Sequence, residues 1–184
     1  WSAIDPSIFG TLFVRGMDPA KRSQLGAQYT SREDIETLIE PVVMAPLRRE
    51  WAERRELARR LLTTGNKAEG AEPPKKGLSG NALAKAELEA REILSSFLGR
   101  LERVKILDPA CGSGNFLYVA LRKIKDLELE VTNFFLDQGL NAPFHLGFWP
   151  VQLYGIDKDV YAHELAQMTV WIGYLQWLRQ HGTT

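Results

Sequence analysis

A strand, a glycine-rich loop and a helix follow one another in the middle of the sequence, and this feature constrains the fold most strongly. Residues 104–107 form a short apolar run that ends at Asp108, as expected for a buried parallel strand that stops at a loop. Gly112 and Gly114 follow, and a helical pattern of apolar residues begins at Phe116. Such a unit is the usual opening of an α/β sheet.

The same pattern returns near the end of the chain. Helical spacing runs over residues 116–137, a loop rich in glycine and proline follows at 138–150, and residues 151–156 form a second apolar run. A last helix is expected over residues 160–179. The order strand, helix, strand, helix predicts an α/β fold with parallel strands and right-handed crossovers.

Helical patterns also fill much of the N-terminal half. Thr30 and Glu33 have the spacing of a capping box, which predicts a helix start. Pro41 and Pro46 predict a break before the next helix, at residues 47–62. Arginine and glutamate alternate along that helix at the spacing of intrahelical ion pairs, which favours a solvated face over a phosphate-binding stripe.

A change of composition separates this helix from the next. Residues 63–80 are rich in glycine and proline and predict a flexible surface loop. The helix after Asn81 carries an apolar stripe that we expect to pack on the sheet: Ala90, Leu94, Phe97, Leu98 and Leu101. We therefore divide the chain into a helical N-terminal region, residues 1–102, and an α/β domain, residues 103–184.

The glycine loop predicts a cofactor site. Its backbone N–H groups and the positive end of the following helix suit a ligand pressed against the main chain, either a dinucleotide or S-adenosylmethionine. Asp108 would repel a pyrophosphate and attract the ammonium group of a methionine moiety. Leu117 stands where the dinucleotide fingerprint has its third glycine. Both points favour S-adenosylmethionine.

A second carboxylate, Asp157, follows the second strand and is placed to accept the ribose hydroxyls of an adenosine. Structural alternatives stay open for each residue of this site. Asp108 could cap the following turn, Cys111 could be a small apolar filler, and Asp157 could cap the last helix.

Composition excludes several classes of protein. The formal net charge is +0, so no overall basic field indicates a nucleic-acid partner for this part of the protein. Cys111 is the single cysteine, which excludes an internal disulfide and a cysteine-rich zinc site, and we expect no metal. No apolar run approaches the ~20 residues of a membrane span, and no signal peptide opens the chain. We expect a cytoplasmic protein without membrane contact.

The string Asp-Pro-Ala-Cys-Gly-Ser-Gly-Asn-Phe-Leu, residues 108–117, resembles the first motif of the gamma-type, N6-adenine-specific DNA methyltransferases. Residues 25–31 resemble the N-terminal motif of that family, with Ser31 in place of its usual proline. Residues 22–26, together with segments 161–167 and 171–174, are similar to the MmeI-type enzymes, in which modification and restriction share one polypeptide.

This resemblance implies a Rossmann-like S-adenosylmethionine-dependent methyltransferase fold, truncated after its second strand. Tyr29 and Thr30 would contact the methionine portion of the cofactor, the segment 108–114 would cradle it, and Asp157 would hold the ribose. The implied cofactor-binding residues are Tyr29, Thr30, Asp108, Pro109, Ala110, Cys111, Gly112, Gly114, Asn115, Phe116 and Asp157.

Adenine methylation in this family relies on an Asn/Asp-Pro-Pro-Tyr/Phe motif, which holds a flipped-out base. No such motif occurs in the chain, and residues 141–144 are a near miss that precedes the second strand. We therefore expect the N-terminal part of an enzyme that meets DNA through the full-length protein, inactive by itself, with any self-association not physiological. The alternatives are a methyltransferase acting on RNA, protein or a small molecule, and a non-catalytic nucleotide-binding module.

Overall fold

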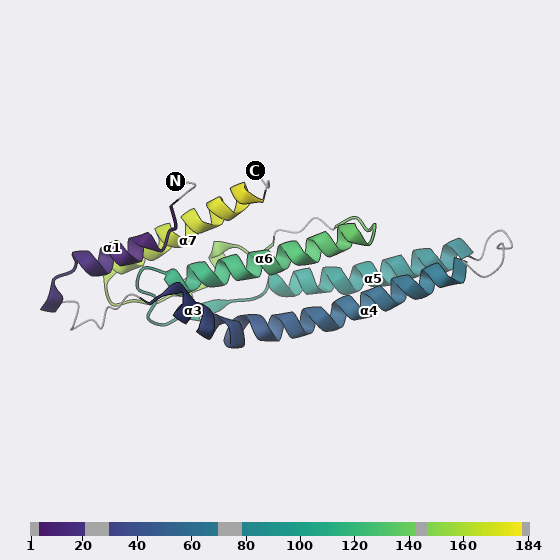
Figure 1. The fold of residues 1–184 in the computed structure, drawn as a ribbon, viewed down its shortest axis with the longest axis horizontal. Coiled ribbons are helices and arrows are strands. Elements are labelled where there is room, and N and C mark those ends of the chain that lie inside the picture. The colour runs from purple at the N-terminus through teal and green to yellow at the C-terminus, as the bar shows by residue number, and fades with distance from the viewer. Residues whose placement is uncertain (1–3, 21–29, 70–78, 143–146, 182–184) are drawn as a thin grey trace. The chain divides into compact units, whose positions relative to one another are not determined.

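The computed structural model describes residues 4–20, 30–69, 79–142 and 147–181, and helices make up most of them. The α-helices are α1 (Ile8–Gly16), α3 (Arg32–Ile39), α4 (Ala45–Glu69), α5 (Ser79–Leu101), α6 (Asn115–Asp137) and α7 (Val160–Gln180) (Figure 1). A π-helical turn, η1 (Glu40–Met44), and a 3₁₀ turn, η2 (Pro150–Gln152), accompany the short strands β1 (Ile106–Asp108) and β2 (Leu153–Gly155).

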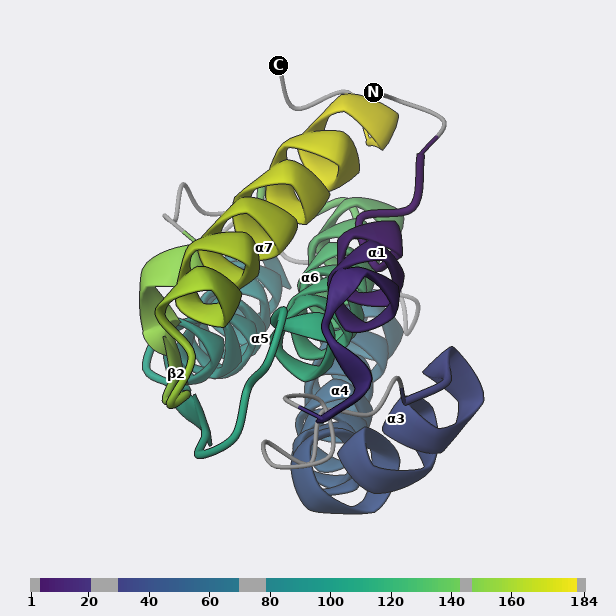
Figure 2. The ribbon, with the colours of Figure 1, turned by 90° about the vertical axis from the view of Figure 1, so that its left-hand side faces the viewer.

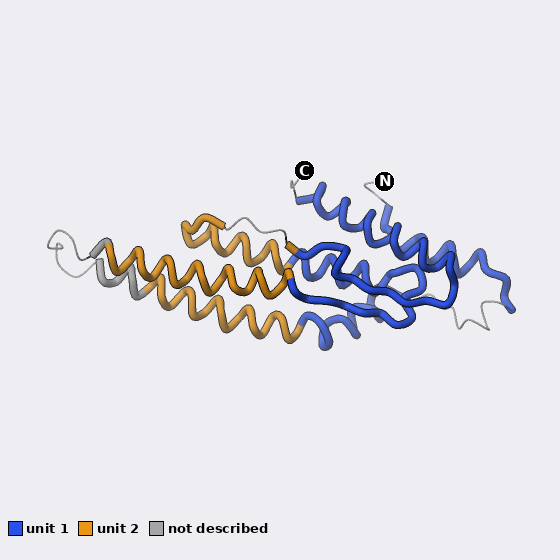
Figure 3. The backbone as a smooth tube through the Cα atoms, turned by 180° about the vertical axis from the view of Figure 1, so that it is seen from behind, with its two compact units in different colours: residues 1–44, 103–126, 148–184 blue, residues 45–102, 127–147 orange. Residues whose placement is uncertain are grey.

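These elements form two compact units, which Figure 3 shows in different colours. The first unit consists of residues 1–44, 103–126 and 148–184 and holds both strands together with α1, α3 and α7. The second consists of residues 45–102 and 127–147 and holds α4, α5 and the second half of α6. Each unit contains residues from before and after the predicted boundary between residues 102 and 103. The division into two domains at this boundary stays a prediction.

β1 and β2 pair in parallel, with Asp108 opposite Gly155. Two further backbone hydrogen bonds continue the contact past the strand ends. The N–H of Ile156 donates to the carbonyl of Asp108 at 2.9 Å, and the N–H of Cys111 donates to the carbonyl of Ile156 at 3.0 Å. The predicted parallel pairing is confirmed, and the carboxyl ends of both strands meet at one edge.

The strands are shorter than predicted because a 3₁₀ turn and a side-chain hydrogen bond replace part of the backbone pairing between them. η2 begins at Pro150, which lacks an N–H donor, and includes the first two residues of the predicted second strand, 151 and 152. The side-chain amide of Gln152 instead donates to the carbonyl of Val104 at 2.8 Å. The structure shows a two-stranded parallel sheet among helices, and the larger Rossmann-like sheet stays a prediction.

α7 packs against both α6 and α1 within the first unit (Figure 2). Gly173 marks its closest approach to α6, because a Cβ atom at this position would collide with the ring of Tyr118. The indole N–H of Trp177 donates to the carboxylate of Asp126 at 2.7 Å. These contacts hold α7 against α6, and the helix predicted over residues 160–179 is confirmed.

The predicted start of α3 is wrong by one residue. Ser31, not Thr30, is the N-cap, and its hydroxyl accepts a hydrogen bond from the backbone N–H of Asp34 at 3.2 Å. Neighbouring Thr and Ser can both cap a helix, so the sequence offered two starting points.

The predicted break near residues 40–46 is a π-helical turn, and the chain continues from it directly into α4. Pro41 and Pro46 lack the N–H groups that a regular helix would pair at these positions.

Lys123 of α6 lies 3.6 Å from Glu36 and 3.5 Å from Glu40, measured from ammonium nitrogen to carboxylate oxygen. These ion pairs connect α6 to α3 and η1.

Trp51 of α4 is the centre of the core of the second unit. Its ring stacks on Phe97 of α5 at a centroid distance of 5.4 Å and meets the ring of Phe134 of α6 edge-on at 5.6 Å. Its indole N–H donates to Glu130 at 2.7 Å. The predicted stripe on α5 is buried as expected, but it packs on α4 and not on the sheet.

α4 is longer than predicted, because it runs to Glu69, and α5 begins at Ser79. The predicted loop at 63–80 is therefore wrong at both ends, and its remainder, residues 70–78, lies outside the described residues. A single glycine such as Gly65 costs about 1 kcal/mol in a helix and does not end one. The predicted intrahelical ion pairs are confirmed, for example Arg54 with Glu50 at 2.9 Å.

Two kinds of feature are missing from the described part of the chain. None of its helices is long and apolar enough to cross a membrane. None of its His, Cys, Asp and Glu side chains form a group of three that could hold a metal ion.

Truncation of the α5 stripe should destabilise the second unit. Leu94 is 0% exposed, and we expect Leu94→Ala to lower the free energy of unfolding by about 2–5 kcal/mol through lost burial and a cavity. Leu88 on the same helix is 56% exposed, so Leu88→Ala should change it by less than about 0.5 kcal/mol. Urea unfolding of both variants measures the difference, and equal losses would contradict the assigned packing.

Candidate functional site

The loop between β1 and α6 packs directly against the second strand and the last helix. Gly114 has a φ of +81°, and a Cβ atom there would lie 2.9 Å from the Cα of Ala166 in α7. A Cβ atom on Gly155 would lie 2.7 Å from the sulfur of Cys111. Both glycines are therefore required by close approach, and Gly155 is a site residue that the sequence analysis missed.

Leu117 explains why the loop departs from the dinucleotide fingerprint. Its side chain is 4% exposed, and its Cδ1 would lie 3.2 Å from a Cβ atom on Gly155. A large side chain here fills the space between α6 and β2, where the fingerprint places a third glycine for close helix packing.

Asp157 ties the loop to the end of β2. One carboxylate oxygen accepts the N–H of Gly112 at 2.9 Å, and the other accepts the N–H of Asp159 at 2.8 Å. Asp159 is the N-cap of α7 and accepts the N–H groups of Tyr161 and Ala162. The alternative that Asp157 itself caps the last helix is therefore wrong.

Asp108 has one satisfied and one unsatisfied carboxylate oxygen. Oδ1 accepts the N–H of Ala110 at 3.0 Å, so the turn-capping alternative is confirmed. Oδ2 is buried and finds no donor among the residues that the structure describes. Burial, followed by the charge of Asp157, raises the pKa of Asp108 above its ordinary value. Among the described residues, the site thus holds a carboxylate with no positive charge among the causes that shift its pKa.

Cys111 behaves as a small apolar filler. Its side chain is buried against β2, and burial together with the charges of Asp108 and Asp157 raises the pKa of its thiol to about 11. The thiol therefore stays protonated at neutral pH and is a poor nucleophile.

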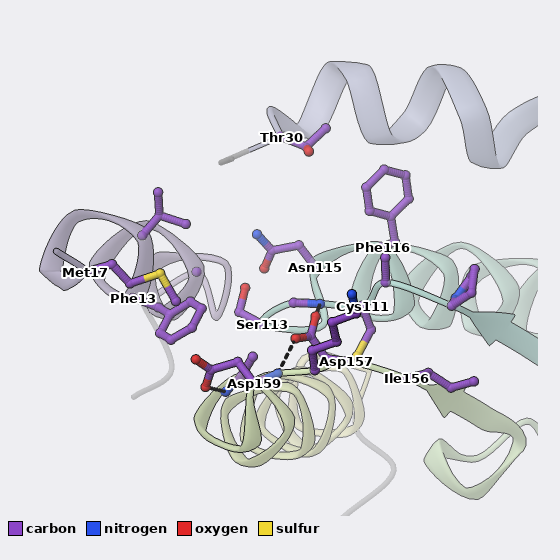
Figure 4. Close-up of a pocket in the computed structure, with 17 residues that line it drawn as sticks. Phe13, Met17, Thr30, Cys111, Ser113, Asn115, Phe116, Ile156, Asp157 and Asp159 are labelled. Atoms are coloured by element: carbon purple, nitrogen blue, oxygen red, sulfur yellow. Dashed lines mark hydrogen bonds between the residues drawn. The ribbon is translucent and has the colours of Figure 1, made fainter. Parts of the chain in front are cut away.

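A pocket of about 420 Å³ lies at the carboxyl ends of the strands (Figure 4). Eight of the predicted cofactor-binding residues line it: Thr30, Pro109, Ala110, Cys111, Gly112, Asn115, Phe116 and Asp157. Asp108 and Gly114 lie next to lining residues without forming the wall themselves. Tyr29 lies outside the described residues. The structure thus brings together most of the predicted site.

Other lining residues were not predicted. Ser113 comes from the loop, Ile156, Lys158 and Asp159 follow β2, and Ala162 belongs to α7. The remaining ones come from α1 and its C-cap residue, whose part in the site no local motif indicated. Asn115 also stands out, because its side-chain oxygen is buried and has no partner within the described residues.

The two loop glycines should respond differently to substitution. Gly112→Ala adds a side chain in open space at a φ of +50°, so only the cost of a left-handed residue, roughly 1 kcal/mol, is expected. Gly114→Ala adds a collision with the backbone of Ala166 and should destabilise the protein clearly more. Thermal unfolding of the two variants compares them, and equal losses would refute the close packing of the loop on α7.

Comparison with solved structures and curated proteins finds several similar proteins. It superposes with a TM-score of 0.71 and 28% identity on the structure of the Type IIL restriction-modification enzyme MmeI in complex with DNA, over 98% of this chain and 20% of that one. It is 25% identical over 173 residues to DNA methyltransferase A of Bacillus subtilis (strain 168), covering 94% of this chain and 16% of that protein.

A putative type II restriction enzyme and methyltransferase of Methanocaldococcus jannaschii is 33% identical over 88 residues, which are 48% of this chain and 8% of that protein. The chain thus spans a fifth or less of each of these relatives. Residues 83–183, more than half of the chain, match the family described as "MmeI, DNA-methyltransferase domain". This chain belongs to the family of MmeI-type DNA-methyltransferase domains.

Proposed function

We propose that this chain is the S-adenosylmethionine-binding part of a Rossmann-like DNA methyltransferase that modifies adenine at N6 in a restriction-modification system. The observation that carries this proposal is the pocket at the parallel strand ends, where the glycine loop meets Asp157 and where Asp108 lies directly beside the lining residues Pro109 and Ala110. Family membership and the names of the relatives support the reaction and the biological setting.

The polar atoms around the pocket fit this cofactor. Asp108 retains a buried oxygen without a donor, and an ammonium group is the ligand chemistry that satisfies such an oxygen. Asn115 offers a second side-chain oxygen at the pocket wall that has no partner among the residues the structure describes. The volume of about 420 Å³ falls within the ~300–1,000 Å³ usual for small-molecule sites.

The proposed roles follow from these positions. Asp108 attracts the amino group of the methionine portion, and Thr30 and Tyr29 contact the same portion. Asp157 holds the ribose hydroxyls with lone pairs that its two backbone hydrogen bonds leave unused. The bound cofactor supplies an electrophilic methyl group, while the residues of this chain bind and orient it.

The base chemistry requires residues beyond those of this chain. No Asn/Asp-Pro-Pro-Tyr/Phe motif occurs in the 184 residues, and the near miss at 141–144 lies partly outside the described residues. An enzyme that methylates a base must extrude it from the duplex and hold its amino group. We propose that other parts of the longer protein do this, and that this chain alone transfers no methyl group.

Titration calorimetry with S-adenosylhomocysteine and with NAD tests the cofactor assignment. We expect heat of binding with S-adenosylhomocysteine and none with NAD, because the charge of Asp108 repels a pyrophosphate. Binding of NAD alone would overturn the assignment in favour of a nucleotide-binding module. Methyl transfer to DNA by the 184-residue chain would overturn the proposal that the catalytic residues lie elsewhere.

Asp108→Asn should separate binding from stability. The raised pKa means that the fold disfavours the carboxylate, a cost that is present at neutral pH and disappears as the pH falls through the folded-state pKa. The amide keeps an oxygen for the N–H of Ala110, so the variant should unfold at a higher temperature than the wild type at pH 7.

The same variant should bind S-adenosylhomocysteine roughly tenfold to a hundredfold more weakly, because a charge-assisted hydrogen bond is lost. The matched control is Asp137→Asn, which removes an exposed charge at the end of α6 and should change neither quantity. Unchanged affinity of Asp108→Asn, measured by calorimetry, would contradict the role of Asp108.

A further inference from the structure

One side of α1 faces the pocket. Gly10, Phe13 and Val14 line it from a single face of the helix, at a spacing of three and four residues, and Met17, the C-cap residue directly after α1, lines it as well. Figure 4 shows Phe13 and Met17 on the α1 side of the pocket, across from the loop and the end of β2. α1 thus forms a continuous wall of the pocket.

The absence of a side chain at Gly10 allows α1 to lie this close. A Cβ atom there would collide with the hydroxyl of Ser113 and would lie 2.8 Å from the side-chain nitrogen of Asn115. Glycine within a helix costs about 1 kcal/mol relative to alanine. The close approach of α1 to the glycine loop explains why glycine stands at this helical position.

Two further contacts hold α1 in place within the first unit. The ring of Phe13 meets the ring of Tyr161 of α7 at a centroid distance of 5.6 Å. Just before the helix, the carbonyl of Ile4 accepts a hydrogen bond from the side chain of Gln176 at 2.8 Å. α1 is therefore packed on α7, and the ring of Phe13 both contacts Tyr161 and lines the pocket.

The α1 wall complements the rest of the pocket chemically. Phe13, Val14 and Met17 offer an aromatic ring, a branched alkyl group and a thioether, whereas the end of β2 contributes Asp157 and the start of α6 contributes Asn115. A ligand that fits both sides has a nonpolar surface as well as hydroxyl and charged groups. A nucleoside joined through sulfur to an amino acid has this composition.

We propose that α1 is part of the cofactor site, with Phe13 and Met17 packing on the nonpolar surface of the bound S-adenosyl ligand and Gly10 setting the distance to the loop. This inference rests on the proposed function. It makes Phe13 and Met17 residues that determine affinity for the cofactor, in addition to the loop and the two strand-end carboxylates.

Phe13→Ala in the full chain tests the inference, with Leu12→Ala as the matched control. Leu12 is the neighbouring residue on the same helix and is 60% exposed. We expect the dissociation constant for S-adenosylhomocysteine to rise on the order of tenfold for Phe13→Ala and to stay unchanged for Leu12→Ala. Gly10→Ala should weaken binding as well, because it pushes α1 away from the loop.

Hydrogen exchange on the unmodified chain gives a second test that needs no variant. S-adenosylhomocysteine should slow amide exchange over residues 8–17 as well as over the loop at 111–116. Protection of the loop without any change in α1, or equal affinity of Phe13→Ala and the wild type, overturns the inference while the proposed function stands. No binding by the wild type overturns both.

Discussion

Two glycines, which have no Cβ atom, allow the loop after β1 to lie directly on β2 and α7. Gly114 approaches the backbone of Ala166 in α7, and Gly155 of β2 leaves room for Cys111. Because of this packing, the N–H of Gly112 reaches the carboxylate of Asp157, and both strand ends open into the same pocket. A side chain at either glycine would push the loop after β1 away from β2 or α7 and disrupt the pocket.

The packing also has an electrostatic consequence. It brings Asp108 and Asp157 together, with no positive charge from the described residues shifting the pKa of Asp108, and this pKa rises because the charged form is poorly solvated. A fold that keeps a buried carboxylate oxygen unpaired is less stable than it could be. Such a cost is typical of binding sites, where the ligand provides the missing partner.

Local patterns predicted the central part of this arrangement. The run at 104–107, the glycines and the helical spacing from Phe116 placed the loop correctly, because strand, turn and helix signals are all encoded within a few residues. The same holds for the parallel pairing, since two apolar runs separated by a helix have few other arrangements.

Other features depend on contacts that no local pattern encodes. The stripe on α5 showed that Leu94 is buried, but not that α4 would cover it. Gly10 precedes the loop residue Ser113 by about a hundred positions, so only the folded chain reveals why a glycine stands there. The extent of α4 was underestimated because composition suggested a loop where the helix continues to Glu69.

A crystal structure of the chain with S-adenosylhomocysteine tests the central claim most directly. The account predicts the ligand in the pocket at the strand ends, with its amino group within about 3 Å of a carboxylate oxygen of Asp108 and its ribose hydroxyls on Asp157. A ligand bound elsewhere, or one whose amino group leaves the buried oxygen of Asp108 without a partner, would contradict it.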